Sequence, residues 1–468
     1  MRSLAKATSI FQLFKQAIRG DEQNFTEGSI NKAIFMLSIP MILEMAMESL
    51  FAVVDIFYVS RLNDSHAVAV VGLTESVLTL VYSIAIGLSM GATAMVARRI
   101  GEKNTKGAAV AALQSIYVGF TIASVIGALG FFFYKDILLL MGASGEIITT
   151  GSGYTRWMFV GNFSVMLLFL INAVFRGAGN AAVAMRSLWF ANIINIIIDP
   201  IFIFGLGPMA GFGVEGAAIA TNIGRTAGVV YQVVYLMRGK GILKVHLAPL
   251  AINWAIIGRL LKVSAGGTGQ FLIASASWIF LVKIMAGFGS AALAGYTIAI
   301  RVIMFTILPS WGMSNASATL VGQNLGAAQP DRAEHSVWKT GFYNMIFLTV
   351  VMVVFLLFSE NILRLFTTEE QVVYYGMRCL QIIALGYIFY GYGMIIAQSF
   401  NGAGDTRTPT ILNLFAFWFL QVPLAYVLAI PLGFGPLGVF AAIPIAESAL
   451  TIASVAIFRK GKWKSVKI

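Results

Sequence analysis

The chain has 468 residues, of which 58% are hydrophobic and only 11% are charged, whereas soluble globular proteins carry about 25% charged residues. A mean hydropathy of +0.84 leaves too little polar surface to enclose a core of this size in water, which excludes a soluble enzyme or nucleic-acid-binding protein. The single cysteine, Cys379, excludes an intramolecular disulfide, and three widely spaced histidines argue against a zinc site. We therefore expect an all-α integral membrane protein surrounded by lipid.

The first 32 residues are expected to form a cytoplasmic segment with a short amphipathic helix. Ile10, Phe11, Phe14 and Ile18 recur at helical spacing, and basic residues lie on the opposite side. Such a helix lies on a membrane surface. A disordered leader stays open as the alternative.

Apolar stretches bounded by polar residues, glycine or proline predict the membrane-spanning helices. Twelve such stretches follow, at about residues 34–60, 67–97, 107–134, 154–176, 183–206, 214–237, 256–286, 291–321, 335–358, 371–400, 408–432 and 438–458. An even number of spans returns the chain to the side on which it began.

The basic residues indicate which side that is. If the amino terminus is cytoplasmic, the segments on that side carry 24 Lys and Arg residues and the opposite segments carry 5. The positive-inside rule then places both termini in the cytoplasm, in a multi-pass protein of the cell inner membrane. The net charge of +12 is explained by this topology, and no nucleic-acid partner is expected.

An internal repeat divides the chain into two halves. A shift of 225 residues without any gap places Gly87 on Gly312, Gly101 on Gly326 and segment 175–179 on segment 400–404. Six helices in each half give a parallel repeat about the membrane normal, which is typical of alternating-access transporters. We expect an amino-terminal lobe at 33–240, a cytoplasmic linker at 241–262, a carboxy-terminal lobe at 256–458 and a basic tail at 459–468.

The repeated segments resemble the multidrug and toxic compound extrusion family of secondary transporters over about residues 30 to 460. LSIPMILEMAMESLFAVVDIFYVSRL opens the first half, GLSMGATAMVARRIGEKNTKGA is repeated as GMSNASATLVGQNLGAAQPDRA, and FRGAGN is repeated as FNGAGDTRTPT. The resemblance implies twelve helices in two V-shaped lobes. It also implies export of cationic amphipathic compounds, driven by inward flow of protons or sodium ions.

Nine ionisable side chains fall within the predicted spans, where each costs at least ~2.5 kcal/mol to insert. They are Glu44, Glu48, Asp55, Glu75, Asp199, Arg225, Lys283, Arg301 and Glu447. Two interpretations of Glu44 and Glu48 stay open: they line a substrate cavity with Met41, Met45 and Phe51, or they pair with a base of a neighbouring helix such as Lys283 or Arg301. The pattern assigns no role to Glu75, Lys283, Arg301 or Glu447.

Asp199 has the clearest chemistry of the nine. It follows Asn195 by four residues, so both lie on one helical face, and Pro200 leaves the carbonyl of Ile196 without its helical hydrogen bond. A carboxylate, an amide and a free carbonyl suit a proton or a small hard cation. A hydrogen bond that only joins helices is the alternative.

The family resemblance implies a cation site in the amino-terminal lobe. Its members would be Asp55 on helix 1, Asn172 on helix 4, Asn195 and Asp199 on helix 5, and Thr221 on helix 6. Pro40 resembles the proline at which helix 1 of the family bends on protonation. Phe51 stands where the family frequently has a tyrosine.

The repeat predicts that this site is present in one lobe. The five site positions correspond in the second half to Phe280, Ala397, Leu420, Leu424 and Ala446, which are all apolar. Ala274 and Tyr390 occupy the approximate positions of the acids found in the norfloxacin-transporter branch. The chain therefore looks more similar to the DNA-damage-inducible branch.

A flippase for a lipid or a lipid-linked saccharide is the alternative function on the same fold. Six acids against three bases within the spans favour cationic cargo over anionic headgroups. An intramembrane enzyme is disfavoured because neither DDxxD nor HExxH occurs. We expect a monomer that uses no cofactor besides its coupling ion, H⁺ or Na⁺.

Overall fold

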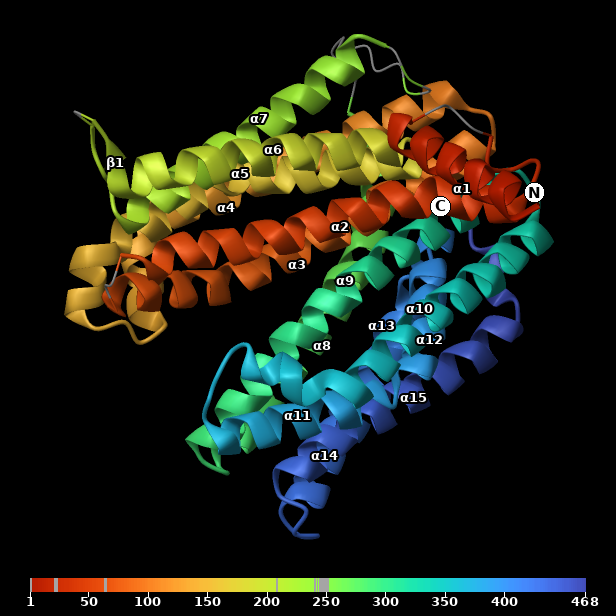
Figure 1. The fold of residues 1–468 in the computed structure, drawn as a ribbon. Helices are drawn as coiled ribbons and strands as arrows, with labels where there is room; N and C mark the ends of the chain where they lie inside the picture. The colour runs from red at the N-terminus through yellow and green to blue at the C-terminus, as the bar shows by residue number, and fades with distance from the viewer. Residues whose placement is uncertain are drawn as a thin grey trace.

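Two helical lobes form a V that is closed at one end (Figure 1). The computed structural model describes residues 2–20, 24–62, 65–207, 209–239, 241, 243 and 252–468; the predicted linker at 241–262 lies partly outside them. The first lobe contains α2 (Ile30–Ser60), α3 (Ser65–Gly101), α4 (Thr105–Leu140), α5 (Gly145–Gly177), α6 (Ala181–Phe204) and α7 (Val214–Met237). The second contains α8 (Trp254–Ala286), α9 (Ser290–Gly326), α10 (Pro330–Arg364), α11 (Glu370–Ala384), α12 (Tyr387–Ala403), α13 (Arg407–Asn413), the π-helix η1 (Leu414–Gln421), α14 (Val422–Ala429) and α15 (Pro436–Arg459). Both chain ends lie where the lobes meet.

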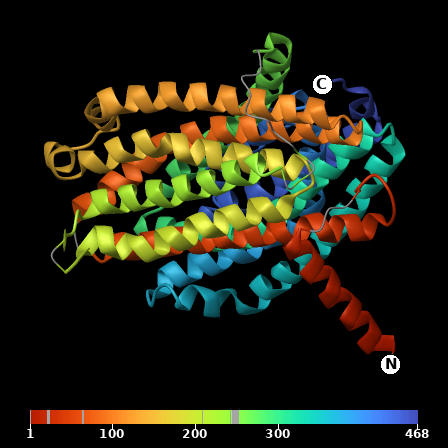
Figure 2. The same cartoon turned by 90° about the horizontal axis from the view of Figure 1, so that it is seen from above.

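Short elements complete the chain. Helix α1 (Arg2–Arg19) covers the region predicted to be an amphipathic helix, and it projects away from the helical body (Figure 2). Its Phe11 is 68% exposed. Strands β1 (Gly205–Leu206) and β2 (Met209–Ala210) pair antiparallel at the open end of the V. A 3₁₀ turn, η2 (Lys462–Ser465), follows α15.

Each of the twelve predicted stretches is helical over most of its length; 183–206 ends in strand β1, and 408–432 runs past the end of α14. Within the described residues, ten helices are long and apolar enough to cross a membrane, and α11 and α12 reach that length and apolarity only when taken together. The predicted sixth span, α7, is outside this set, although it packs against α5 and α6 within the first lobe. We attribute this to Glu215 and Arg225, which lower its hydropathy.

Two predicted helix boundaries were wrong for identifiable reasons. Helix α5 begins at Gly145 rather than at residue 154, because the Ser144 side chain accepts a hydrogen bond from the Ile147 amide and caps a helix whose first turns are polar. The predicted span 371–400 is two helices bent by 60°. At the break, a Cβ on Gly386 would approach the Pro444 side chain to 2.7 Å, so glycine permits the close contact with α15.

The two lobes meet through contacts that obey the internal repeat. A Cβ on Gly101 would lie 1.9 Å from the carbonyl oxygen of Gln323, and a Cβ on Gly326 would lie 2.1 Å from that of Arg98. Gln323 and Gly326 are the repeat counterparts of Arg98 and Gly101, so each lobe makes the same contact on the other. The side chain of Gln323 also donates to the Gly177 carbonyl at 3.0 Å. These contacts hold the closed end of the V together.

We expect Gly101→Leu to disrupt this contact. The added side chain has no space beside the Gln323 backbone, and overpacking of this kind costs about 1–3 kcal/mol. Gly72→Leu on the same helix is the control, because no atom lies within 4 Å of a Cβ there. Thermal melting of the purified protein should show a lower midpoint for Gly101→Leu than for Gly72→Leu; equal midpoints would contradict the packing described.

Candidate functional site

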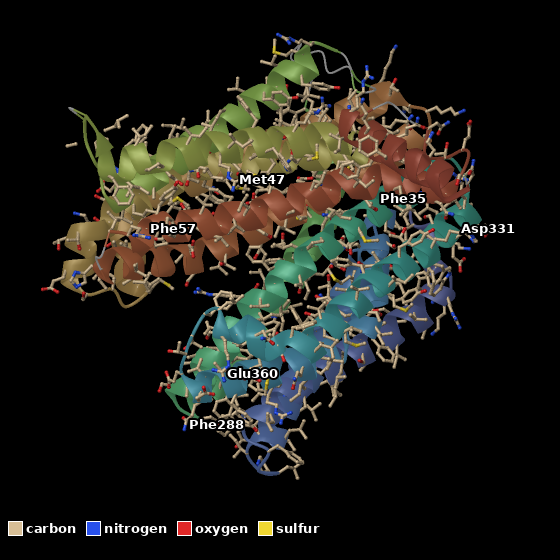
Figure 3. The ribbon with its side chains drawn as sticks, viewed as in Figure 1. Phe35, Met47, Phe57, Phe288, Asp331 and Glu360 are labelled. Atoms are coloured by element: carbon tan, nitrogen blue, oxygen red, sulfur yellow. The ribbon has the colours of Figure 1, made fainter. Side chains whose placement is uncertain are left out.

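Helix α2 borders the second lobe and carries three acids into the first. Figure 3 labels Phe35, Met47 and Phe57 along this helix, from the closed end of the V towards the open end. Glu44, Glu48 and Asp55 face polar side chains of α5, α6 and α7 at three successive levels. Each level compensates its acid differently.

At the level nearest the closed end, Glu44 is paired through Oε1, whereas its buried Oε2 has no hydrogen-bond partner among the described residues. Its Oε1 accepts from the Arg176 guanidinium at 2.7 Å and from the Asn172 amide at 3.0 Å. The Asn172 side-chain oxygen in turn accepts from Ser187 at 2.8 Å and from Gln232 at 2.6 Å. The network is buried, with Glu44 only 1% exposed.

These contacts revise three predictions. Asn172 lies in the Glu44 network and forms no hydrogen bond with the other predicted cation-site residues described. Glu44 is paired, but with Arg176 of its own lobe rather than with Lys283 or Arg301. Met41 is 1% exposed in a core cluster between the lobes, so both Met41 and Glu44 are covered by protein at this closed end.

At the middle level, Glu48 forms a two-pronged ion pair with Arg225 of α7. The guanidinium donates to Oε1 at 2.8 Å and to Oε2 at 3.2 Å, and Asn192 of α6 donates to Oε2 at 3.2 Å. Arg225 also lies over the Phe51 ring, 4.7 Å from its centroid. The side chain of Glu48 is 25% exposed and that of Arg225 is 6% exposed. Glu48 and the partly buried Met45 therefore remain nearer to the surface than Glu44.

The third level joins three of the predicted site residues. The Asn195 amide donates to Asp199 Oδ1 at 3.2 Å and to Thr221 Oγ1 at 3.3 Å. Helices α6 and α7 approach closely here, and glycine permits this: a Cβ on Gly224 would lie 2.6 Å from the Ala191 carbonyl oxygen. Asn195 therefore links Asp199, four residues later on α6, to Thr221 of α7.

Buried oxygen atoms at this level have no hydrogen-bond partner among the described residues. They are Oδ1 of Asp55, Oδ1 of Asn195 and Oδ2 of Asp199. Asp55 of α2 lies close enough for its charge to act on Asp199 of α6. An unsatisfied buried acceptor costs about 1–3 kcal/mol, and a proton or small cation would relieve this cost.

The prolines lie within continuous helices. Pro40 precedes Glu44 by one turn in α2, and α6 continues through Pro200 to Phe204. Pro200 lies directly after Asp199 in this helix and lacks a backbone donor.

Sequence reasoning missed part of these networks. Arg176 is one of the 24 basic residues assigned to the cytoplasmic side, and no sequence pattern singled out Asn192 or Gln232. A signal was available for Asn192, which precedes Asn195 by three residues on the same helical face. Tyr154 of α5 also lies near enough for the charges of Asp55 and Asp199 to act on it.

The second lobe has no counterpart of this cluster at the repeat-related positions. Leu424, the counterpart of Asp199, packs against the apolar core of that lobe. Phe280, the counterpart of Asp55, contacts the Trp418 ring edge to face at 5.2 Å between centroids. The glycines at the interface occur at equivalent positions in both lobes, whereas the polar cluster occurs in the first lobe and not at the equivalent positions of the second.

We expect Arg176→Met to destabilise the first lobe, because it leaves Glu44 buried without a positive charge. Breaking a buried pair in this way costs about 3–5 kcal/mol. Arg364→Met is the control, since Arg364 pairs with Glu370 in the open, where their side chains are 42% and 76% exposed. Detergent-induced unfolding measures both variants; a loss no larger for Arg176→Met than for Arg364→Met would contradict the importance of the buried pair.

Comparison with known proteins agrees with this architecture. The family model described as MatE matches residues 40–201 and 268–427. The chain is 26% identical over 455 residues to the probable multidrug resistance protein NorM of Thermotoga maritima, covering 97% of each protein. It is 24% identical to the multidrug export protein MepA of Staphylococcus aureus, covering 93% of this chain and 96% of that protein.

A solved structure described as the outward-facing conformation of a multidrug resistance MATE family transporter superposes with a TM-score of 0.88 at 26% identity. The match covers 94% of this chain and 98% of that one. The prediction of a membrane transporter rather than an enzyme is confirmed by these matches. The chain belongs to the MatE family of multidrug and toxic compound extrusion transporters.

Proposed function

We propose that the protein is a secondary active multidrug efflux antiporter that exports cationic amphipathic compounds in exchange for protons or sodium ions. The lobes at 33–240 and 256–458 would alternate access between the two sides of the membrane. Names of the relatives, multidrug resistance protein and multidrug export protein, support the substrate class. The observation that carries the coupling proposal is the set of unpartnered oxygens of Asp55, Asn195 and Asp199 in one lobe.

The site is suited to coupling because it holds two neighbouring carboxyl groups in a buried lobe. Asp55 and Asp199 cannot both remain ionised cheaply in such surroundings, so binding a cation there stabilises the lobe. Thr221 and Asn195 would position the carboxylate of Asp199 for that cation. Bending of α2 at Pro40 on loading would transmit the change to the lobe interface.

The cationic character of the cargo is proposed from charge and surface. Glu44 and Glu48 are neutralised by arginines, but the other acids within the spans still outnumber the other bases by four to two, which attracts cations. Helix α2 also exposes large apolar side chains at Leu50, Val53 and Phe57. An amphipathic cation needs both kinds of contact.

We further propose where the protein is located and how its termini are oriented, using the distribution of basic residues in the sequence. The excess of basic residues in the segments on the amino-terminal side of the membrane supports cytoplasmic termini and an inner-membrane location. The apolar counterparts of the site in the second lobe support the DNA-damage-inducible branch. The two-lobe chain contains the whole proposed pathway, which supports a monomer.

We expect Asp199→Asn to abolish coupled efflux while the protein still folds and inserts. The amide keeps the shape and part of the hydrogen bonding to Asn195 but removes the charge that a proton or cation neutralises. Drug efflux from everted vesicles, under an imposed pH gradient and then a sodium gradient, measures the effect. Gradient-driven efflux by a well-expressed Asp199→Asn protein would contradict the assignment.

Glu447→Gln provides the matched control for that experiment. Glu447 is a carboxylate of α15 in the second lobe, near Tyr390. We expect its replacement to leave the number of cations exchanged per drug unchanged. A changed stoichiometry would place a coupling site in the second lobe.

We expect drug and coupling cation to compete through the first lobe. Loading the Asp55 and Asp199 pair removes negative charge that attracts a cationic drug, and linkage requires bound drug to lower the affinity for the coupling cation by the same factor. For proton coupling, equilibrium binding of a fluorescent cationic drug should weaken as the pH falls. Affinity that stays constant under both falling pH and rising sodium concentration would contradict competition.

A further inference from the structure

We propose that Arg225 is a resident counter-cation of the first lobe, and that Glu48 keeps it away from the Asp55 and Asp199 carboxylates. Glu48 would thereby set the affinity of the site for its coupling cation. The inference rests on the proposed function, because it assumes that Asp55 and Asp199 load that cation.

Arg225 lies between Glu48 and Asp55, two acids of α2. Its guanidinium lies over Phe51, which is three residues after Glu48 and four residues before Asp55 on α2. Glu48 and Asp55 are seven residues apart, or about 10 Å along the helix axis. On α7, Arg225 is four residues after Thr221 and therefore shares its face. The guanidinium is thus held between the two carboxylates, on the side of Glu48.

Glu48 is well built to hold it there. The two parallel hydrogen bonds match the fork of the guanidinium, which is the strongest arrangement for such a pair. Asn192 donates to the same carboxylate and fixes its orientation. Asp55 and Asp199, in contrast, form no salt bridge within 4.0 Å in the part of the chain that the structure describes.

The charges then explain why Glu48 matters to the site. With Arg225 neutralised by Glu48, the formal charges of Asp55 and Asp199 are left for an external cation. If Arg225 is released, it can move towards Asp55 and occupy the place of that cation electrostatically. Arg225 and the coupling cation therefore compete for the same carboxylates. A stronger ion pair between Glu48 and Arg225 raises the affinity of Asp55 and Asp199 for the coupling cation.

Arg225 has no cationic competitor among the groups that act on the two aspartates. They are Glu75 of α3, Asn195 of α6 and Arg225 of α7, with Tyr82 of α3 and Tyr154 of α5 within range of the same charges. Of these, Arg225 is the one that carries a positive charge. Arg301 of α9 acts on Glu75 and not directly on either aspartate. The analogous pair of Glu44 with Arg176 lies eleven residues before Asp55 and serves as an internal control.

The test uses full-length protein in lipid nanodiscs and tetraphenylphosphonium as the drug, because its charge does not change with pH. Its affinity is measured across pH at fixed sodium, and across NaCl against choline chloride at fixed pH. For proton coupling, Glu48→Gln should lower the midpoint pH of the drug-binding transition by about one unit, a tenfold change in proton affinity. Arg225→Gln should raise the midpoint, and the double variant should lie near the wild type. For sodium coupling, the NaCl titration should show the same order of affinities.

Glu44→Gln should leave the midpoint where it is in the wild type. Asn192→Ala retains both charges, so it tests the idea without the folding risk of an unpaired charge, and it should shift the midpoint in the direction of Glu48→Gln by a smaller amount. Melting temperatures and gel filtration identify any variant that is misfolded.

The inference is overturned if Glu48→Gln and Asn192→Ala both keep the wild-type midpoints, or if Glu44→Gln moves them equally. Asp199→Asn separates this failure from that of the proposed function. If Asp199→Asn removes the transition but Glu48→Gln does not shift it, the coupling site stands and the role of Arg225 is wrong. If Asp199→Asn leaves the transition intact, the coupling site itself is wrong.

Discussion

An acid buried in a lipid-surrounded helix bundle must be compensated, and the first lobe is organised around how this is done along α2. Glu44 is neutralised by Arg176 deep in the closed end, and Glu48 is neutralised by Arg225 at mid-height. Asp55 and Asp199 have no such cationic partner among the described residues. An oxygen of each lacks a hydrogen bond, as Glu44 Oε2 also does, but the charge of Glu44 is balanced by Arg176. Along α2, the two acids nearer the closed end are thus neutralised by arginines of the protein, whereas Asp55 can be neutralised by a cation that enters from solution. The first two acids have a structural role, and the third is available for cation exchange.

The two lobes share a scaffold but not this chemistry. The contacts of Gly101 with Gln323 and of Gly326 with Arg98 repeat each other across the interface, so both lobes present the same surface where they meet. Such symmetric contacts allow two similar bodies to rock about a common end. The second lobe has Leu424 in its apolar core where the first has Asp199. One lobe would therefore sense the cation, and the shared interface would convert its change into movement of both.

Local sequence patterns predicted the helices and the residues that share a helical face. They did not predict contacts between helices that are far apart in the chain. Apolar length predicted twelve helical segments, and the i, i+4 spacing of Asn195 and Asp199 correctly placed them on one face. The partners of Glu44 and Glu48 could not be found in this way, because Arg176 and Arg225 lie 132 and 177 residues away in the chain. Asn172 was grouped with the cation site by resemblance, whereas the polar side chains of Glu44, Ser187 and Gln232 surround it. The bend at Gly386 was missed because its cause is a contact with Pro444.

The central claim is that a cationic drug and the coupling cation exchange through the charge of the Asp55 and Asp199 pair. The most direct measurement is the number of cations released when tetraphenylphosphonium binds to the purified protein, followed as protons in weakly buffered solution and as sodium by its magnetic resonance signal. The wild type, loaded at low pH or high sodium, should release one of these cations on binding drug, whereas Asp199→Asn should bind drug with little or no release. Binding to the wild type without release of either cation, or equal release from Asp199→Asn, would contradict the account.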